Sequence, residues 1–133
     1  MAACRSGITV PTNIWPDTTS RSIAGVTATK ADFSSATLRR ATLDGADLTE
    51  AIFTDASLVE ARARNARLSN ASLNKADLRE VTFERVDLSG CDIRQAQWTG
   101  ARLSGVSMTG AKLAGITGTG LPPEGLRAEW VDI

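Results

Sequence analysis

The side chains that most often perform catalysis are poorly represented in this chain. None of its 133 residues is histidine, so the commonest general base and metal ligand is missing. The two cysteines, Cys4 and Cys91, form no Cys-x-x-Cys pair, and the chain has no phosphate-binding glycine motif or calcium loop. Carboxylates are abundant, but most occupy positions expected to face water, which favours solvation over catalysis. We therefore expect no enzymatic activity, no catalytic residues, no metal site and no cofactor.

The charge balance argues against several classes of partner. Fifteen basic and fifteen acidic residues cancel, and they are interspersed, so no net field attracts nucleic acid or anionic lipid. No segment approaches the roughly 20 apolar residues that span a bilayer. The first ten residues lack the continuous apolar core of a secretory signal, and the two distant cysteines do not suggest a disulfide framework. These features predict a cytoplasmic protein that binds neither membranes nor nucleic acid directly.

A strict repeat of five residues must position any functional side chain. Between Ala31 and Gly115 an apolar residue recurs at every fifth position, and only Ala63 among these seventeen centres is small. Two residues before the centre stands Ala in thirteen repeats and Val or Cys in the other four. A fixed period of this kind indicates one structural unit stacked many times. The centres form the predicted core: Phe33, Leu38, Leu43, Leu48, Phe53, Leu58, Ala63, Leu68, Leu73, Leu78, Phe83, Leu88, Ile93, Trp98, Leu103, Met108 and Leu113.

A period of five fits neither a continuous strand nor a helix, but it does fit a short extended piece followed by a turn. The centre and the residue two before it then point inward, because side chains alternate along an extended chain. The residue between them points outward, and it is polar in nearly every repeat. Glycine and asparagine recur at the corner, where turn geometry favours them.

The repeats Ala-Asp-Phe-Ser-Ser (31–35), Ala-Asp-Leu-Thr-Glu (46–50) and Ala-Asp-Leu-Arg-Glu (76–80) resemble the pentapeptide-repeat family. This resemblance implies an all-β fold, a right-handed four-sided parallel β-helix with four pentapeptides per coil and a little over four coils. Inward side chains would then stack on those twenty residues away. Ala63 would lie between Leu43 and Phe83, and we expect Phe83 to lean over the missing volume. The alternative is a local cavity.

The two ends depart from the repeat, which suggests three segments. We predict an N-terminal cap over residues 1–25, the β-helix over 26–120, and a C-terminal cap or dimerisation segment over 121–133. The caps would cover the unpaired backbone edges of the stack. The segment Leu121-Pro-Pro-Glu-Gly-Leu126 is expected to break the coil. Alternatively, the last segment joins two rods end to end as a homodimer, as in several family members.

Four faces follow from assigning successive pentapeptides around the coil. One face gathers Arg62, Arg64, Arg85 and Arg102 against Asp44 and Glu84, and it is our candidate partner-binding ridge. Along other rows the charge changes sign between coils, as in Asp47, Arg67 and Asp87. Such alternation stabilises the stack, since like charges about 5 Å apart would repel.

Two functions are compatible with such a rod. The first is a non-enzymatic protein-interaction or scaffold module that uses its rigid faces to bind a protein partner. The alternative, implied by the family resemblance, is a modulator of DNA gyrase, a type II topoisomerase, that mimics DNA and gives quinolone-type resistance. A rod of roughly 20 Å would then need about a dozen net negative charges. Between Ala31 and Gly115 eleven acidic residues meet eleven basic ones, so the first function is favoured.

Overall fold

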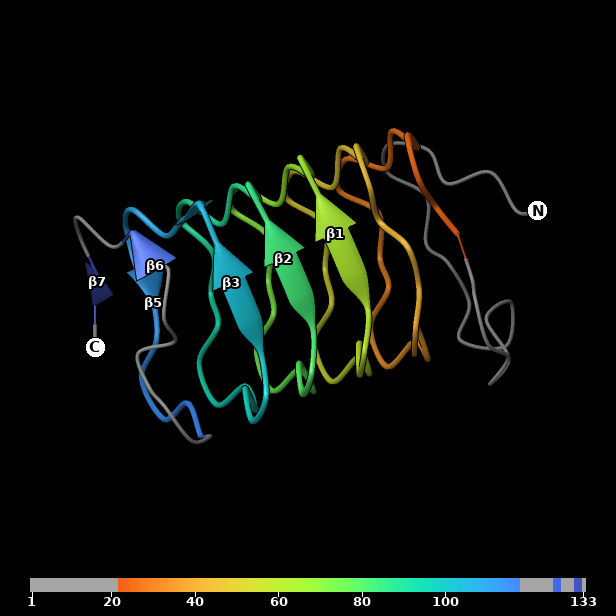
Figure 1. The fold of residues 1–133 in the computed structure, drawn as a ribbon. Helices are drawn as coiled ribbons and strands as arrows, with labels where there is room; N and C mark the ends of the chain where they lie inside the picture. Colours follow the sequence, from red (N-terminus) through yellow and green to blue (C-terminus); the bar gives the residue numbers. More distant parts are fainter. Residues whose placement is uncertain (1–21, 118–125, 128–130, 133) are drawn as a thin grey trace.

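The computed structural model describes residues 22–117, 126–127 and 131–132. They form a rod in which successive coils stack side by side from the N-terminal end to the C-terminal end (Figure 1). Every isolated β-bridge is parallel and joins residues twenty apart, from Ser22 with Thr42 to Gln97 with Thr117. Twenty residues are four pentapeptides, so each coil has four sides. The fold is therefore the predicted four-sided parallel β-helix, and the described residues contain no helix.

The strands are short because each side of the coil is only one pentapeptide long. Parallel pairing joins β1, β2 and β3 into one sheet, β4 with β6 into a second and β5 with β7 into a third. Each pairing keeps the twenty-residue register of the bridges. The strands are β1 (Arg62–Arg64), β2 (Thr82–Glu84), β3 (Arg102–Ser104), β4 (Val106–Ser107), β5 (Ala111–Lys112), β6 (Leu126–Arg127) and β7 (Val131–Asp132).

The regular coil begins earlier than we predicted. Ser22 already pairs with Thr42, Ile23 is fully buried, and Gly25 has the positive φ of a corner. Residues 22–25 thus belong to the β-helix and not to a cap, because Ile23 takes the place of a repeat centre. The other residues of the predicted N-terminal cap lie outside the described residues.

The C-terminal segment returns to the coil. Leu126 pairs with Val106 and Val131 pairs with Ala111, each twenty residues back along the chain. Residues 121–125, where we predicted that the coil breaks, lie outside the described residues, and the parallel register is present at Leu126. In the sequence, Leu126 and Val131 keep the period of five at the position two before the centre.

The corners impose a left-handed backbone at every fifth residue. All nineteen corners from Gly25 to Gly115 have a positive φ, and twelve of them are not glycine. The non-glycine corners have φ between 54° and 62°, and the glycines between 64° and 75°. Non-glycine residues seldom adopt this conformation. The coil thus imposes the left-handed turn on every corner residue. The sequence pattern had suggested this turn only where glycine or asparagine stands at the corner.

Backbone hydrogen bonds repeat from coil to coil. The N–H of Phe33 donates to the carbonyl of Ile52 in the next coil at 2.7 Å, and the N–H of Ile52 donates back to Ala31 at 2.9 Å. The residue after the centre finds a side-chain acceptor in several repeats. The N–H of Ser34, for example, donates to Oδ1 of Asp32 at 2.9 Å. Outward aspartates therefore complete the backbone hydrogen bonding and are not solely surface charges.

The interior is a column of apolar side chains. All seventeen predicted centres are buried, with at most 6% of any one exposed. The rings of Phe33 and Phe53 stack with centroids 4.9 Å apart and planes 4° apart, as expected for inward side chains one coil apart. Ala63 is fully buried and lies in register with Phe83. That Phe83 fills the volume beside Ala63 stays a prediction.

Candidate functional site

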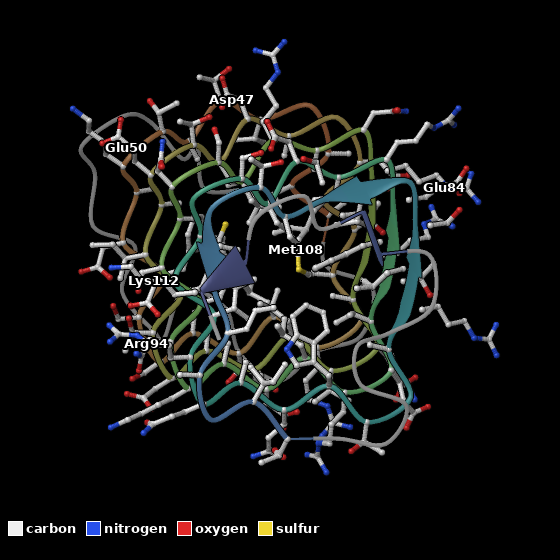
Figure 2. The ribbon with its side chains drawn as sticks, turned by 90° about the vertical axis from the view of Figure 1, so that its left-hand side faces the viewer. Asp47, Glu50, Glu84, Arg94, Met108 and Lys112 are labelled. Carbon is white, nitrogen blue, oxygen red and sulfur yellow. The ribbon has the colours of Figure 1, made fainter. Side chains whose placement is uncertain are left out.

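The parallel register distributes the outward side chains over four faces. The first face is centred on Ile23, Leu43, Ala63, Phe83 and Leu103 and carries β1, β2 and β3, and the others follow in chain order. The second is centred on Ala28 to Met108, the third on Phe33 to Leu113, and the fourth on Leu38 to Trp98. In Figure 2 the thioether of Met108 points into the interior, while Asp47, Glu50, Glu84, Arg94 and Lys112 point outward.

The four arginines of the candidate ridge all lie on the first face. The register of β1, β2 and β3 aligns Arg62 with Thr82 and Arg102 in one column. A second column aligns Arg64 with Glu84, and Arg85 follows at the corner. The three side chains that form ion pairs are well exposed: 49% for Arg62, 51% for Arg64 and 65% for Arg85.

Three of these arginines are held by carboxylates. Nη2 of Arg62 lies 3.2 Å from Oδ2 of Asp44, and Nε of Arg64 lies 3.3 Å from Oε2 of Glu84. Nη2 of Arg85 contacts the other oxygen of Glu84 at 3.3 Å. Exposed pairs of this kind stabilise a fold by at most about 1 kcal/mol each, so their main effect is to restrict side-chain orientation. Four arginines against two carboxylates leave the first face with a net charge of +2.

A polar groove runs along the edge between the fourth and first faces. It has a volume of about 520 Å³ and is lined by Glu60, Glu80, Thr82, Thr99, Gly100 and Arg102. Arg40 binds Glu60 from the preceding coil, with Nε to Oε2 at 3.2 Å. Within the described residues, neither Glu80 nor Arg102 has an ion pair. The sequence analysis missed this groove because its lining comes from three coils.

Two aspartate–arginine pairs of identical design lie on the fourth and third faces. Arg79 binds both oxygens of Asp77 at 2.8 and 2.6 Å, and Arg94 binds both oxygens of Asp92 at 2.8 and 2.7 Å. The side-chain hydrogen bond from each arginine holds the pKa of its aspartate below the ordinary value of 3.8. Sequence reasoning missed these pairs. The sequence pattern that could have revealed them is an Asp directly before and an Arg directly after the same repeat centre. This spacing places both side chains on the outward side of the strand.

No group of side chains with catalytic chemistry emerges in the described part of the chain. Cys91 is fully buried, and its Sγ donates to the carbonyl of Leu68 at 2.8 Å. Burial raises the pKa of this thiol to about 12, so it is not a nucleophile at neutral pH. Residues 22–117 offer no cluster of three metal-ligating side chains. Nor does the described chain hold a helix long and apolar enough to cross a bilayer.

Comparison with known proteins supports the repeat assignment. Residues 23–55, 56–95 and 83–117 match the family model for pentapeptide repeats, in eight copies. A comparison with curated protein sequences found no match.

Solved structures of three repeat proteins are similar to this chain. One is a pentapeptide repeat protein from the thylakoid lumen of Arabidopsis thaliana, 30% identical over 66% of this chain and 58% of its own, with a TM-score of 0.52. Rfr23 from the cyanobacterium Cyanothece 51142 is 20% identical, covers 86% of this chain and 87% of its own, and has a TM-score of 0.50. Full-length QnrB1, a plasmid-mediated fluoroquinolone resistance protein, is 16% identical with a TM-score of 0.35, over 96% of this chain and 92% of its own. This chain spans less than two thirds of the Arabidopsis protein, and the likeness to Rfr23 concerns the fold alone.

Proposed function

The chain belongs to the pentapeptide-repeat family, and from this premise we propose that it is a non-enzymatic protein-interaction or scaffold module. The observation that carries the proposal is the first face, where parallel pairing of β1, β2 and β3 holds outward side chains in fixed columns. A partner that binds such a face orders few additional groups, which lowers the entropic cost of association.

The first face has the composition of a recognition surface. Arginine is enriched at protein interfaces, since its planar guanidinium can bind a carboxylate through two hydrogen bonds while its stem packs. Asp44 and Glu84 restrict three of the four arginines before any partner arrives. The net charge of +2 favours a partner surface with net negative charge, because opposite potentials steer the encounter.

Affinity capture with matched variants tests the assignment of the face. The bait is the full chain carrying Arg62→Gln and Arg64→Gln, compared with the unaltered chain in extract from the native cell. The control bait carries Lys75→Gln and Lys112→Gln, which change charge on the third face. We expect a partner that is captured by the unaltered chain and the control but is lost with the first-face variant. Equal capture by all three baits would contradict the assignment.

The alternative proposal, modulation of DNA gyrase, lacks the charge that DNA mimicry requires. The repeat region carries eleven acidic and eleven basic residues, whereas DNA of similar length carries about a dozen net negative charges. A supercoiling assay with purified gyrase, with and without a quinolone, tests this directly. Inhibition or protection at low micromolar protein would favour the alternative over a general interaction module.

For the C-terminal segment, residues 121–133, we propose a capping role. Strands β6 and β7 occupy the edges of β4 and β5 that would otherwise be open. The homodimer is the alternative, and light scattering after size exclusion separates the two. A cap leaves a monomer of 14.0 kDa, whereas end-to-end pairing doubles this mass. The cytoplasmic location is likewise a proposal, which fractionation of the native cell would test.

A further inference from the structure

The groove between the fourth and first faces has an unusual arrangement of charge. In the corner column that forms one wall, Arg40, Glu60 and Glu80 follow one another at intervals of one coil and Gly100 comes next. Arg40 neutralises Glu60. Glu80, the next carboxylate, lies about 5 Å further along the rod, the spacing of adjacent parallel strands. It interacts electrostatically with Arg79, whose guanidinium is bound to Asp77, but it makes no close ion pair within the described residues.

Gly100 shapes this groove. A Cβ at Gly100 would lie 3.0 Å from Cγ of Glu80, so the glutamate side chain leans over the glycine toward the next coil. Gly105 and Gly115 have the same relation to Arg85 and Gln95, at 3.3 and 3.2 Å. A glycine corner thus leaves space into which the side chain of the residue twenty positions earlier can pack. At Gly100 the side chain that packs in this space is Glu80, which lines the groove.

The opposite wall carries the complementary charge. Arg102 lines the groove from the first face, and it too has no ion pair within the described residues, whereas Arg62, Arg64 and Arg85 are all paired. Thr82, in the same column as Arg102, and Thr99, beside Gly100, also line the groove and supply hydroxyl groups. The groove therefore presents one carboxylate and one guanidinium that make no close ion pair within the described residues, together with neutral hydrogen-bonding groups.

We propose that this groove binds a segment of the protein partner in which a basic side chain adjoins a carboxylate. The basic group binds Glu80, the carboxylate of this column that Arg40 does not reach, because opposite charges on neighbouring strands attract. The carboxylate binds Arg102 through the guanidinium, which suits two-point recognition of carboxylates. This inference rests on the proposed interaction function and gives its partner a definite chemistry.

A small probe with both charges tests the groove without knowledge of the partner. N-acetyl-L-arginine carries a guanidinium and a carboxylate, while N-acetyl-L-arginine amide and N-acetylglycine each carry one of them. Titration into the full chain, followed by amide chemical shifts in NMR spectra, reports both place and affinity. We expect shifts centred on residues 80–82 and 99–102, and binding of the first probe about three to ten times tighter than of either other probe.

Variants identify the two groups. Glu80→Gln should abolish the binding contribution of the probe's guanidinium, and Arg102→Gln should abolish that of the probe's carboxylate. Each variant therefore removes the affinity advantage of N-acetyl-L-arginine over the two singly charged probes. Glu50→Gln and Arg67→Gln are the matched controls, at a corner and a strand position of the second face, and should change nothing. Shifts spread over all charged faces, or an advantage that survives Glu80→Gln and Arg102→Gln, would overturn the proposal.

Capture from the native cell separates this inference from the function on which it rests. If the chain carrying both Glu80→Gln and Arg102→Gln retains a partner that is lost with the combined Arg62→Gln and Arg64→Gln variant, the groove is not the contact. The interaction function then stands without it. If all these variants and the controls capture the same proteins, the first face itself is not the contact.

Discussion

The N-terminal part of the rod, residues 22–85, and the C-terminal part, residues 86–117, share one backbone but differ at their corners. Eleven of thirteen corners are not glycine in the first part, whereas five of six are glycine in the second. The φ angles of both parts nevertheless lie between 54° and 75°. The hydrogen bonds between coils therefore impose the turn. They do so even where a side chain makes the left-handed conformation unfavourable by about 1–2 kcal/mol.

The interiors of the two parts differ as well. The N-terminal part contains the stacked rings of Phe33 and Phe53, both fully buried. In the C-terminal part Leu103 and Leu113 are each 6% exposed, and the buried indole Nε1 of Trp98 has no hydrogen-bond partner within the described residues. The N-terminal part thus has most of the strained corners, and the least buried of the repeat centres lie in the C-terminal part.

The largest effect should come from the core of the N-terminal part. Phe53→Ala removes one ring of the stack and leaves a cavity, so we expect a loss of about 3–5 kcal/mol in the free energy of unfolding. Leu113→Ala, in the same column near the C-terminal end, should cost about 2 kcal/mol. Urea denaturation measures both. Equal losses would show that the two parts do not differ in core packing.

Ala63→Leu tests whether the N-terminal part has unused volume. If Phe83 fills the space beside Ala63, the added atoms overpack the column and destabilise the fold by about 1–3 kcal/mol. Replacing Phe83 by Ala in the same chain should then recover part of that loss. Thermal unfolding provides the comparison, and a more stable Ala63→Leu chain would reveal a cavity instead.

Gly45 and Gly90 form a matched pair of corners, one in each part. Their φ angles are 67° and 69°, but a Cβ would meet open space at Gly45 and Oδ1 of Asn70 at Gly90. Gly45→Ala should therefore cost about 1 kcal/mol, the left-handed penalty less the gain from a stiffer unfolded chain. Gly90→Ala should cost about 1 kcal/mol more, because Asn70 must move. The excess should vanish when Asn70 is also changed to Gly.

Asp55→Gly would make an N-terminal corner resemble the C-terminal ones. Asp55 has a φ of 59°, and glycine removes the steric penalty while increasing the entropy of the unfolded chain. We expect a net gain of at most about 1 kcal/mol by chemical denaturation. Asp55→Ala keeps a Cβ and is the control that should give no gain. A loss of stability on Asp55→Gly would mean that its side chain contributes more than its strain costs.

The smallest expected effect is a pH dependence common to both parts. Hydrogen bonds from Arg79 and Arg94 lower the pKa of Asp77 and Asp92 below 3.8. Each carboxylate therefore contributes stability that is present above about pH 4 and is lost as the pH falls through the lowered pKa. Arg79→Gln and Arg94→Gln should flatten the fall of the melting temperature between pH 4 and pH 2.5. An unchanged profile would show that these exposed pairs contribute nothing measurable.

The sequence was informative about what happens within one pentapeptide and much less so about what lies between coils. The seventeen centres, their inward direction and the outward aspartates follow from alternation along five residues, and the structure places them accordingly. The start of the coil at Ile23 was missed because Arg21 and Ala24 do not match the repeat consensus. The parallel register at Leu126 was missed because prolines precede it and because the apolar residue stands two positions before the repeat centre.

The candidate site could be predicted only in outline. The pentapeptide count placed Arg62, Arg64, Arg85 and Arg102 on one face. It could not say that, among the described residues, Arg102 is the one of these four without an ion pair. Nor could it find the groove, whose walls combine Glu60, Glu80 and Arg102 from three successive coils.

The period of five determined by itself which side chains enter the core and which face water, because extended backbone alternates and a turn must follow within five residues. The family resemblance added the number of sides. Tertiary structure alone decided which charges meet, since contacts between coils join residues eighteen to twenty apart, as in Arg62 with Asp44 and Arg40 with Glu60. Each such contact depends on how a long side chain leans along the rod. That lean is set by the neighbour one coil away, such as the bare glycine beneath Glu80.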